Sequence, residues 1–158
     1  MAPVSRLSIV LGKTLGGSTV AMLQGLAILA VCVALGVQVD PMGVPLGLGF
    51  MVLTAFFAVG LGLIIASKLE DFEGFSLIMN LLVMPMVLLS TAFFPLSSAP
   101  EWMRPVILMD PLTYAVDGLR GALVGSSVNS LVLDLAVLAA LCASTLLLGS
   151  YLFKRCEA

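Results

Sequence analysis

The chain has 158 residues, of which 61% are hydrophobic and only 10% charged, and its formal net charge is −2. A water-soluble domain of this size has too little interior to bury so much apolar surface. Nucleic acid is not expected as a partner, because no cluster of Lys and Arg is present to bind phosphates. The composition predicts an all-α protein that lies in a lipid bilayer.

Four apolar stretches are long enough to cross a bilayer as helices. A hydrocarbon core about 30 Å thick needs roughly 20 apolar residues, because every backbone N–H and C=O there must be hydrogen-bonded internally. The predicted spans are residues 15–37, 44–66, 75–94 and 131–153. Residues 1–158 are therefore predicted to form a single transmembrane domain.

Residues 1–14, which precede the first span, contain a short sequence that is similar to part of a nucleotide site. Gly12-Lys13-Thr14 resembles the end of a phosphate-binding loop, but that motif needs a glycine where Leu7 stands. The sequence also has no histidine, which removes the common histidine-dependent hydrolase sites. No catalytic, cofactor-binding or metal-binding residue is predicted, and any ATP hydrolysis is expected on a separate subunit.

The two short links between the first three spans are predicted to be tight turns. Residues 38–43 contain a proline and a glycine, which do not continue a helix. In the second link, Asp71 and Glu73 precede the third span and suit the positive end of its helix dipole. Helix capping is the expected role of both carboxylates.

The basic residues predict the orientation of the chain, since Lys and Arg accumulate on the cytoplasmic side. With both termini in the cytoplasm, five basic residues lie inside and two outside. The inside set is Arg6, Lys13, Lys68, Lys154 and Arg155, and the outside set is Arg104 and Arg120. The expected location is the plasma, or inner, membrane.

Only one ionisable residue, Asp134, lies well within a predicted span. Buried charges in a bilayer are costly and often mark functional sites. Asp134 is near the outer end of the fourth span, so it can reach the headgroups, or it can serve a substrate or a proton. Both interpretations remain open from the sequence.

Residues 95–126 are too polar and too rich in proline to form a plain span, and two short helices are expected there. Pro100 and Asp110-Pro111 each predict a helix start, because proline suits the first helical position and aspartate caps it. Trp102 and Tyr114 have the character of residues at the headgroup level. Asp117 and Arg120 are spaced to pair on one helix face. An interfacial hairpin that only connects two spans would also fit this pattern.

Two motifs resemble those of one family. The run F-P-L-S-S-A-P-E-W followed by D-P-L-T-Y-A-V-D-G-L-R is similar to the C-terminal signature of ABC-2-type transporter permeases, the membrane subunits of ATP-driven exporters of the daunorubicin-resistance and polysaccharide-export kinds. The N-terminal run A-P-V-S-R-L-S-I-V-L-G-K-T-L is similar to the cytoplasmic loop before the third span of that family. The resemblance covers essentially the whole chain.

The resemblance implies roles for residues at both ends of the molecule. An ABC ATPase subunit is the implied partner of the N-terminal segment, and the segment 95–126 is implied to be a re-entrant hairpin on the outer face, near the exit of the substrate path. A homodimer or a second permease is the implied membrane partner. The ATPase-coupling candidates are Pro3, Arg6, Gly12 and Lys13. The outer gate candidates are Phe94, Pro95, Pro100, Trp102, Asp110, Pro111, Tyr114, Asp117 and Arg120.

The chain departs from the family in its number of spans. Family members usually carry six, and this sequence begins just before the third. The expected function is that of a permease subunit that exports a drug, a lipid-linked molecule or a glycan. The alternative is a truncated membrane scaffold or assembly partner that does not transport.

Overall fold

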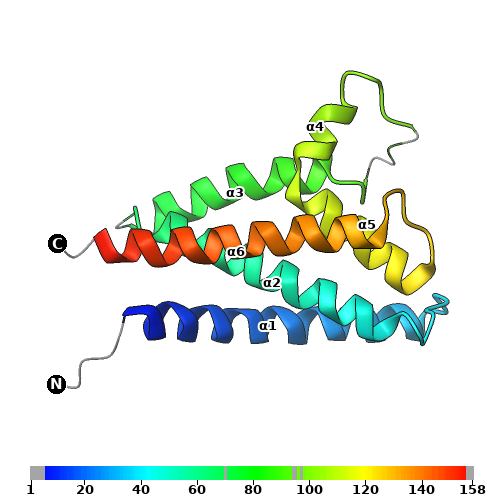
Figure 1. Ribbon diagram of the computed structural model, residues 1–158, viewed down its shortest axis with the longest axis horizontal. Coiled ribbons are helices and arrows are strands. Elements are labelled where there is room, and N and C mark those ends of the chain that lie inside the picture. The colour runs from blue at the N-terminus through cyan, green and yellow to red at the C-terminus, as the bar shows by residue number, and fades with distance from the viewer. Residues whose placement is uncertain (1–5, 70, 94–95, 97, 156–158) are drawn as a thin grey trace.

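A computed structural model describes residues 6–69, 71–93, 96 and 98–155, and all regular secondary structure in these residues is helical (Figure 1). The six helices of this part of the chain are α1 (Arg6–Ala34), α2 (Val44–Ala66), α3 (Phe72–Leu89), α4 (Arg104–Met109), α5 (Pro111–Val124) and α6 (Leu131–Arg155).

Four of the helices are long and apolar enough to cross a membrane, which confirms the all-helical, four-span prediction. Their candidate spans are Leu11–Ala34, Val44–Ala66, Phe72–Leu89 and Leu131–Gly149. Helix α2 has the bounds that the sequence predicts. Helix α1 ends earlier than expected, and Gly36, at a φ of 90°, lies just beyond its end. Helix α3 ends at Leu89, because Ser90 is extended and its hydroxyl turns back to donate to the carbonyl of Val87.

Local capping explains where α3 and α5 begin. The carboxylate of Asp71 accepts a hydrogen bond from the Gly74 N–H, and Glu73 lies in the first turn of α3, as predicted. The carboxylate of Asp110 accepts from the Leu112 N–H, and Pro111 is the first residue of α5. A side-chain oxygen at this position satisfies an N–H group that has no partner within the helix.

The expected helix start at Pro100 is wrong. The carbonyl of Pro100 accepts from the N–H groups of Met103 and Arg104, which closes a turn before α4 begins at Arg104. Pro105 then stands in the first turn of α4. The first short helix is therefore shorter and later than the proline pattern predicts.

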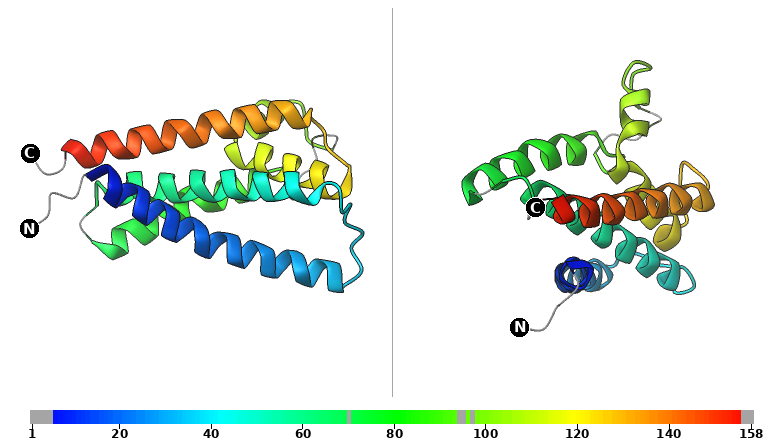
Figure 2. Two further views of the ribbon diagram at one scale, coloured as in Figure 1. Left: turned by 60° about the horizontal axis from the view of Figure 1, so that its bottom comes forward. Right: turned by 60° about the vertical axis from the view of Figure 1, so that its left-hand side comes forward.

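Helix α2 lies at the centre of the bundle, against α1, α5 and α6 (Figures 1 and 2). Its Phe50 is fully buried and forms the core together with Ala115 and Ala122 of α5 and Leu138 of α6. Helix α3 lies at the edge, and none of its residues, all of which are described, is buried. In a membrane, lipid or another protein would cover such a helix.

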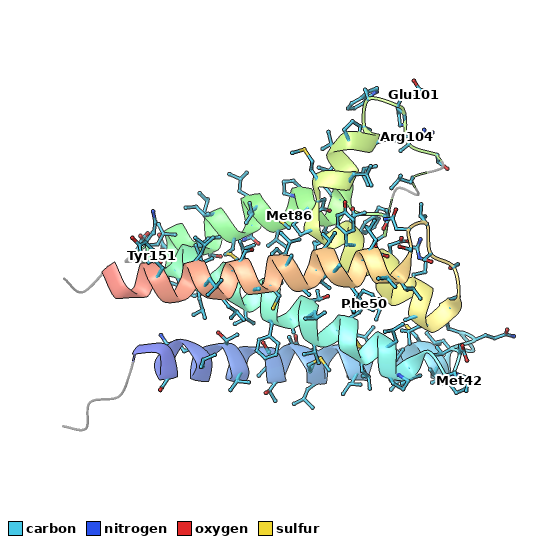
Figure 3. All side chains as sticks on the ribbon, viewed as in Figure 1. Met42, Phe50, Met86, Glu101, Arg104 and Tyr151 are labelled. Atoms are coloured by element: carbon cyan, nitrogen blue, oxygen red, sulfur yellow. The ribbon has the colours of Figure 1, made fainter. Side chains whose placement is uncertain are left out.

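Both described chain ends lie at the same end of the bundle (Figure 2). The turn between α1 and α2 lies at the opposite end, where the Asp40 N–H donates to the Leu123 carbonyl at 2.8 Å. Figure 3 shows Met42 at this end, Phe50 in the middle and Tyr151 near the termini. The turn from α5 to α6 is also at the end away from the termini.

Candidate functional site

A set of buried polar side chains surrounds α5, and we call it the α5 junction. Its members come from the end of α3, from α5 and from the first turn of α6. They are Thr91, Asp110, Thr113, Asp117, Arg120 and Asp134. All but Arg120 are buried, and Arg120 is half-buried. Polar groups that are removed from water are costly unless they have hydrogen-bond partners.

Asp110 combines burial with helix capping. One of its oxygens accepts from Leu112, whereas Oδ2 is buried without a hydrogen-bond donor. Burial raises the pKa of Asp110 above its ordinary value of 3.8, and the backbone N–H of Leu112 and the nearby Thr113 hydroxyl oppose this effect. The predicted capping role is confirmed, and the side chain is also a buried titratable group that the sequence did not indicate.

The end of α3 is attached to α5 by two hydrogen bonds to backbone carbonyls. The Thr91 hydroxyl donates to the Thr113 carbonyl at 3.5 Å, and Arg120 Nη2 donates to the Thr91 carbonyl at 3.3 Å. Arg120 therefore does not pair with Asp117, and that prediction is wrong. The spacing along α5 permits the ion pair, but Thr91 and the turn after α5 give the two side chains different partners.

Asp117 holds the turn that connects α5 to α6. Its carboxylate accepts from the Val128 N–H at 2.9 Å and from the Asn129 N–H at 2.8 Å. Asn129 Nδ2 in turn donates to Asp134 Oδ1 at 3.4 Å. Asp134 is fully buried, so its side chain does not reach out of the protein toward the headgroups. No local sequence signal links positions 117 and 134, since the contact depends on how the two helices pack.

The two aromatic residues expected at the headgroup level have different surroundings. Trp102 is 71% exposed and lies in the turn before α4. The Tyr114 hydroxyl donates to the Leu108 carbonyl at 2.7 Å, which attaches α5 to α4. Tyr114 therefore stabilises the α4–α5 hairpin, whereas the side chain of Trp102 is free to contact the surrounding lipid or water.

A cavity of about 530 Å³ lies between α1, α2 and α5. Its wall is almost entirely apolar, and it includes Met22, Cys32, Met51, Leu112 and Val116. The hydroxyl of Thr54, also in the wall, donates to the Phe50 carbonyl of its own helix. Sequence reasoning missed this cavity, because its lining comes from three helices and no single segment carries its pattern.

The predicted site residues fall into two groups at opposite ends of the bundle. Arg6 begins α1, and Gly12 and Lys13 are exposed on that helix near the chain termini. The other group lies in the hairpin and includes the exposed Pro100 and the half-buried Pro111. Its other members are Trp102, Asp110, Tyr114, Asp117 and Arg120. Pro3, Phe94 and Pro95 lie outside the described residues.

Comparison with known proteins gives one family match and several relatives. The sequence model of the family described as ABC-2 type transporter matches residues 1–124. The capsule polysaccharide export inner-membrane protein CtrC of Neisseria meningitidis serogroup B is 35% identical over 114 residues, which cover 72% of this chain and 42% of that protein. Nodulation protein J of Rhizobium meliloti is 27% identical over 147 residues, or 93% of this chain and 56% of that protein.

Nodulation protein J of Sinorhizobium fredii is also 27% identical, over 130 residues that cover 82% of this chain and 49% of that protein. The chain thus spans about half the length of these relatives. No solved structure matches the chain.

Proposed function

The chain belongs to the ABC-2 type transporter family, and on that premise we propose that it forms the membrane-spanning part of a permease in an ATP-driven exporter. The family match over residues 1–124 is the observation that carries the proposal. Four helices with the length and composition of membrane spans support it, as expected of a multi-pass membrane protein. Energy comes from a separate ABC ATPase subunit, and the permease acts as a homodimer or paired with a second permease.

The chain lies in the inner membrane, and the end of the bundle that holds both termini faces the cytoplasm. The ATPase docks at this end. Lys13 supports this placement, because it is exposed on α1 near the N-terminal end. Lys68 is an exposed lysine in the short link between α2 and α3, near the same end. Pro3, Arg6 and Gly12 contribute to the same coupling segment.

The α4–α5 hairpin acts as an outer re-entrant gate. Its position away from the termini and its attachments to the neighbouring helices support this role. Asp110 and Pro111 start the return helix, and Tyr114 attaches it to α4. Asp117 attaches it to the turn before α6, and Arg120 attaches it to Thr91, just beyond the end of α3. Pro100 and Trp102 form the entry to the hairpin, and Phe94 and Pro95 are candidates for the same gate from the sequence.

A glycan is the first cargo to test, because a relative carries the name of a capsule polysaccharide export protein. A lipid-linked molecule or a drug is the alternative cargo. The apolar cavity between α1, α2 and α5 suits a hydrocarbon portion of such a molecule better than a bare sugar, since its wall offers almost no hydrogen-bonding groups.

The decisive experiment measures ATP hydrolysis by a candidate ABC ATPase from the same genome, with and without the purified chain in lipid nanodiscs. We expect the chain to co-purify with the ATPase and to change its rate. Lys13→Gln should weaken this effect several-fold, because it removes an exposed cation from the docking segment. Lys68→Gln is the matched control, an exposed lysine near the same end that should retain the effect.

Two results would count against the proposal. If the chain neither binds the ATPase nor alters its rate, the exporter function fails for this chain, and a membrane scaffold or assembly partner becomes the better interpretation. If Lys13→Gln and Lys68→Gln weaken coupling equally, the coupling role of the α1 segment fails while the permease function stands.

A further inference from the structure

The carboxyl groups of Asp117 and Asp134 meet inside the protein. Both residues are 0% exposed, and Asn129 bridges their carboxyl groups, because its backbone N–H donates to Asp117 and its side-chain Nδ2 donates to Asp134. The two carboxyl groups are within hydrogen-bonding reach of each other. Asp117 lies in the middle of α5, and Asp134 lies in the first turn of α6. The contact therefore joins two helices that the chain connects only by a short turn.

The hydrogen bonds around the pair are unequal. Asp117 receives the N–H groups of Val128 and Asn129, which suit an ionised carboxylate. Asp134 receives only the longer bond from Asn129 Nδ2, and its Oδ2 is buried with no hydrogen-bond donor in reach. An unpartnered carboxylate oxygen that is removed from water carries a large free-energy cost.

The described hydrogen-bond donors to the two carboxyl groups are N–H groups of Val128 and Asn129, and none is a cation. On α5, the guanidinium of Arg120 is directed to the Thr91 carbonyl. Helix α2 and the turn at 125–130 carry no charged residue. The remaining basic residues of the packed helices α1 and α6 are Arg6, Lys13, Lys154 and Arg155, and all belong to the end of the bundle that holds the termini.

We propose that Asp117 and Asp134 bind one proton between them, with the neutral acid of Asp134 donating to the carboxylate of Asp117. Two ionised carboxylates in contact, away from water and without a cation, repel each other strongly, and sharing a proton removes that repulsion. When Oδ2 of Asp134 carries the proton, this otherwise unpartnered atom donates a hydrogen bond to the carboxylate of Asp117. The pair then carries one negative charge, which the two N–H groups on Asp117 stabilise.

The shared proton fastens the first turn of α6 to α5. Its loss would place a second negative charge beside the first and push the two helix segments apart. This site is separate from the coupling segment, and it does not depend on the proposed export function.

Infrared spectroscopy of the full chain in lipid nanodiscs tests the proposal, because the C=O stretch of a protonated carboxyl group is separate from that of a carboxylate. We expect a protonated-carboxyl band that persists above the pH range in which exposed carboxyl groups ionise, and that Asp134→Asn abolishes. Glu101→Gln removes an exposed carboxyl and should leave the band unchanged. Asp110→Asn removes the third buried carboxyl group of the α5 junction, beside Asp117 and Asp134, so its effect shows whether Asp110 contributes a second component to the band.

The partnership itself is tested by Asp117→Asn, which keeps an oxygen acceptor but removes the negative charge. We expect the Asp134 band to move to higher frequency, since an amide oxygen accepts a weaker hydrogen bond than a carboxylate does. If the frequency of the Asp134 band does not change, Asp134 does not donate to Asp117 and the proposal is overturned.

If Asp134→Asn does not fold, a titration of the unsubstituted protein gives the answer. The expected band is present above the pH range in which exposed carboxyl groups ionise, disappears as the pH is raised further and does not depend on sodium. The absence of a protonated band above that range would overturn the proposal, as would its persistence in a folded Asp134→Asn variant. A band that sodium removes would also overturn it, because a metal cation would then occupy the site.

Discussion

At the scale of single residues, Asp110 ends one short helix and begins the next. Its carboxylate accepts from the Leu112 N–H, so Asp110→Ala should lower the free energy of unfolding by about 1 kcal/mol, the usual value of an N-cap. Asp110→Asn should cost much less, because asparagine caps as well as aspartate does. Thermal unfolding of the three proteins in one detergent checks this order. Equal losses in both variants would show that the cap does not stabilise the fold.

The same residue predicts a pH dependence of stability. Burial raises the pKa of Asp110 above 3.8, so over the pH range just above that value the folded chain keeps a proton that the unfolded chain has lost. The folded state then binds more protons, and its stability falls as the pH rises through this window. Asp110→Asn should remove part of the slope, as measured by unfolding midpoints across the acid range. Glu101→Gln, an exposed control, should keep the full slope, and an unchanged slope in Asp110→Asn would contradict the prediction.

Whether the sequence could predict the contact of a polar side chain depended on the distance along the chain to its partner. The caps of Asp71 and Asp110 were predictable, because each bonds to an N–H only two or three residues away. Asp117 and Arg120 were not, since their partners lie at Val128 and Asn129 and at Thr91. Spacing along one helix says which side chains can meet, and packing decides whether they do.

At the scale of helices, the contact of α2 with α5 depends on Gly118. A β-carbon at Gly118 would overlap the ring of Phe50, which is fully buried. Gly118→Ala should therefore destabilise the protein by about 1–3 kcal/mol through overpacking. Gly49→Ala is the matched control in α2, where a β-carbon meets no atom within 4 Å.

We expect Gly49→Ala to stabilise the protein by up to about 1 kcal/mol, because alanine is the better helix former. Unfolding midpoints in detergent should thus move in opposite directions for the two variants. A stable Gly118→Ala variant would show that α2 and α5 do not pack as closely as the structure has them.

Long and short helices were not equally predictable. Hydropathy alone was enough for the four long helices, because a bilayer requires an uninterrupted apolar stretch in each. The short α4 was placed several residues too early, because Pro100 fits a turn as well as a helix start. A helix of one or two turns depends on its surroundings more than on its own sequence.

At the scale of the whole molecule, α2 organises the bundle. It contacts α1, α5 and α6, and the apolar cavity lies on its side toward α1 and α5. Neither the central position of α2 nor the cavity could be predicted from the sequence, because all four long helices are apolar around most of their circumference. Such helices show little periodicity to indicate which face packs against which neighbour.

The distribution of basic residues predicts that both termini face the cytoplasm, and the structure shows where to test it. Met42 is 92% exposed and lies with Glu101 at the end away from the termini. The link between α2 and α3, which contains the exposed Lys68, lies at the end that holds the termini. In a variant with the native cysteines replaced, Met42→Cys and Glu101→Cys should react with a membrane-impermeant maleimide in right-side-out vesicles. Lys68→Cys should react only in inside-out vesicles. The reverse pattern would place the termini outside, and protection of Glu101→Cys where Met42→Cys reacts would contradict an outer position of the hairpin.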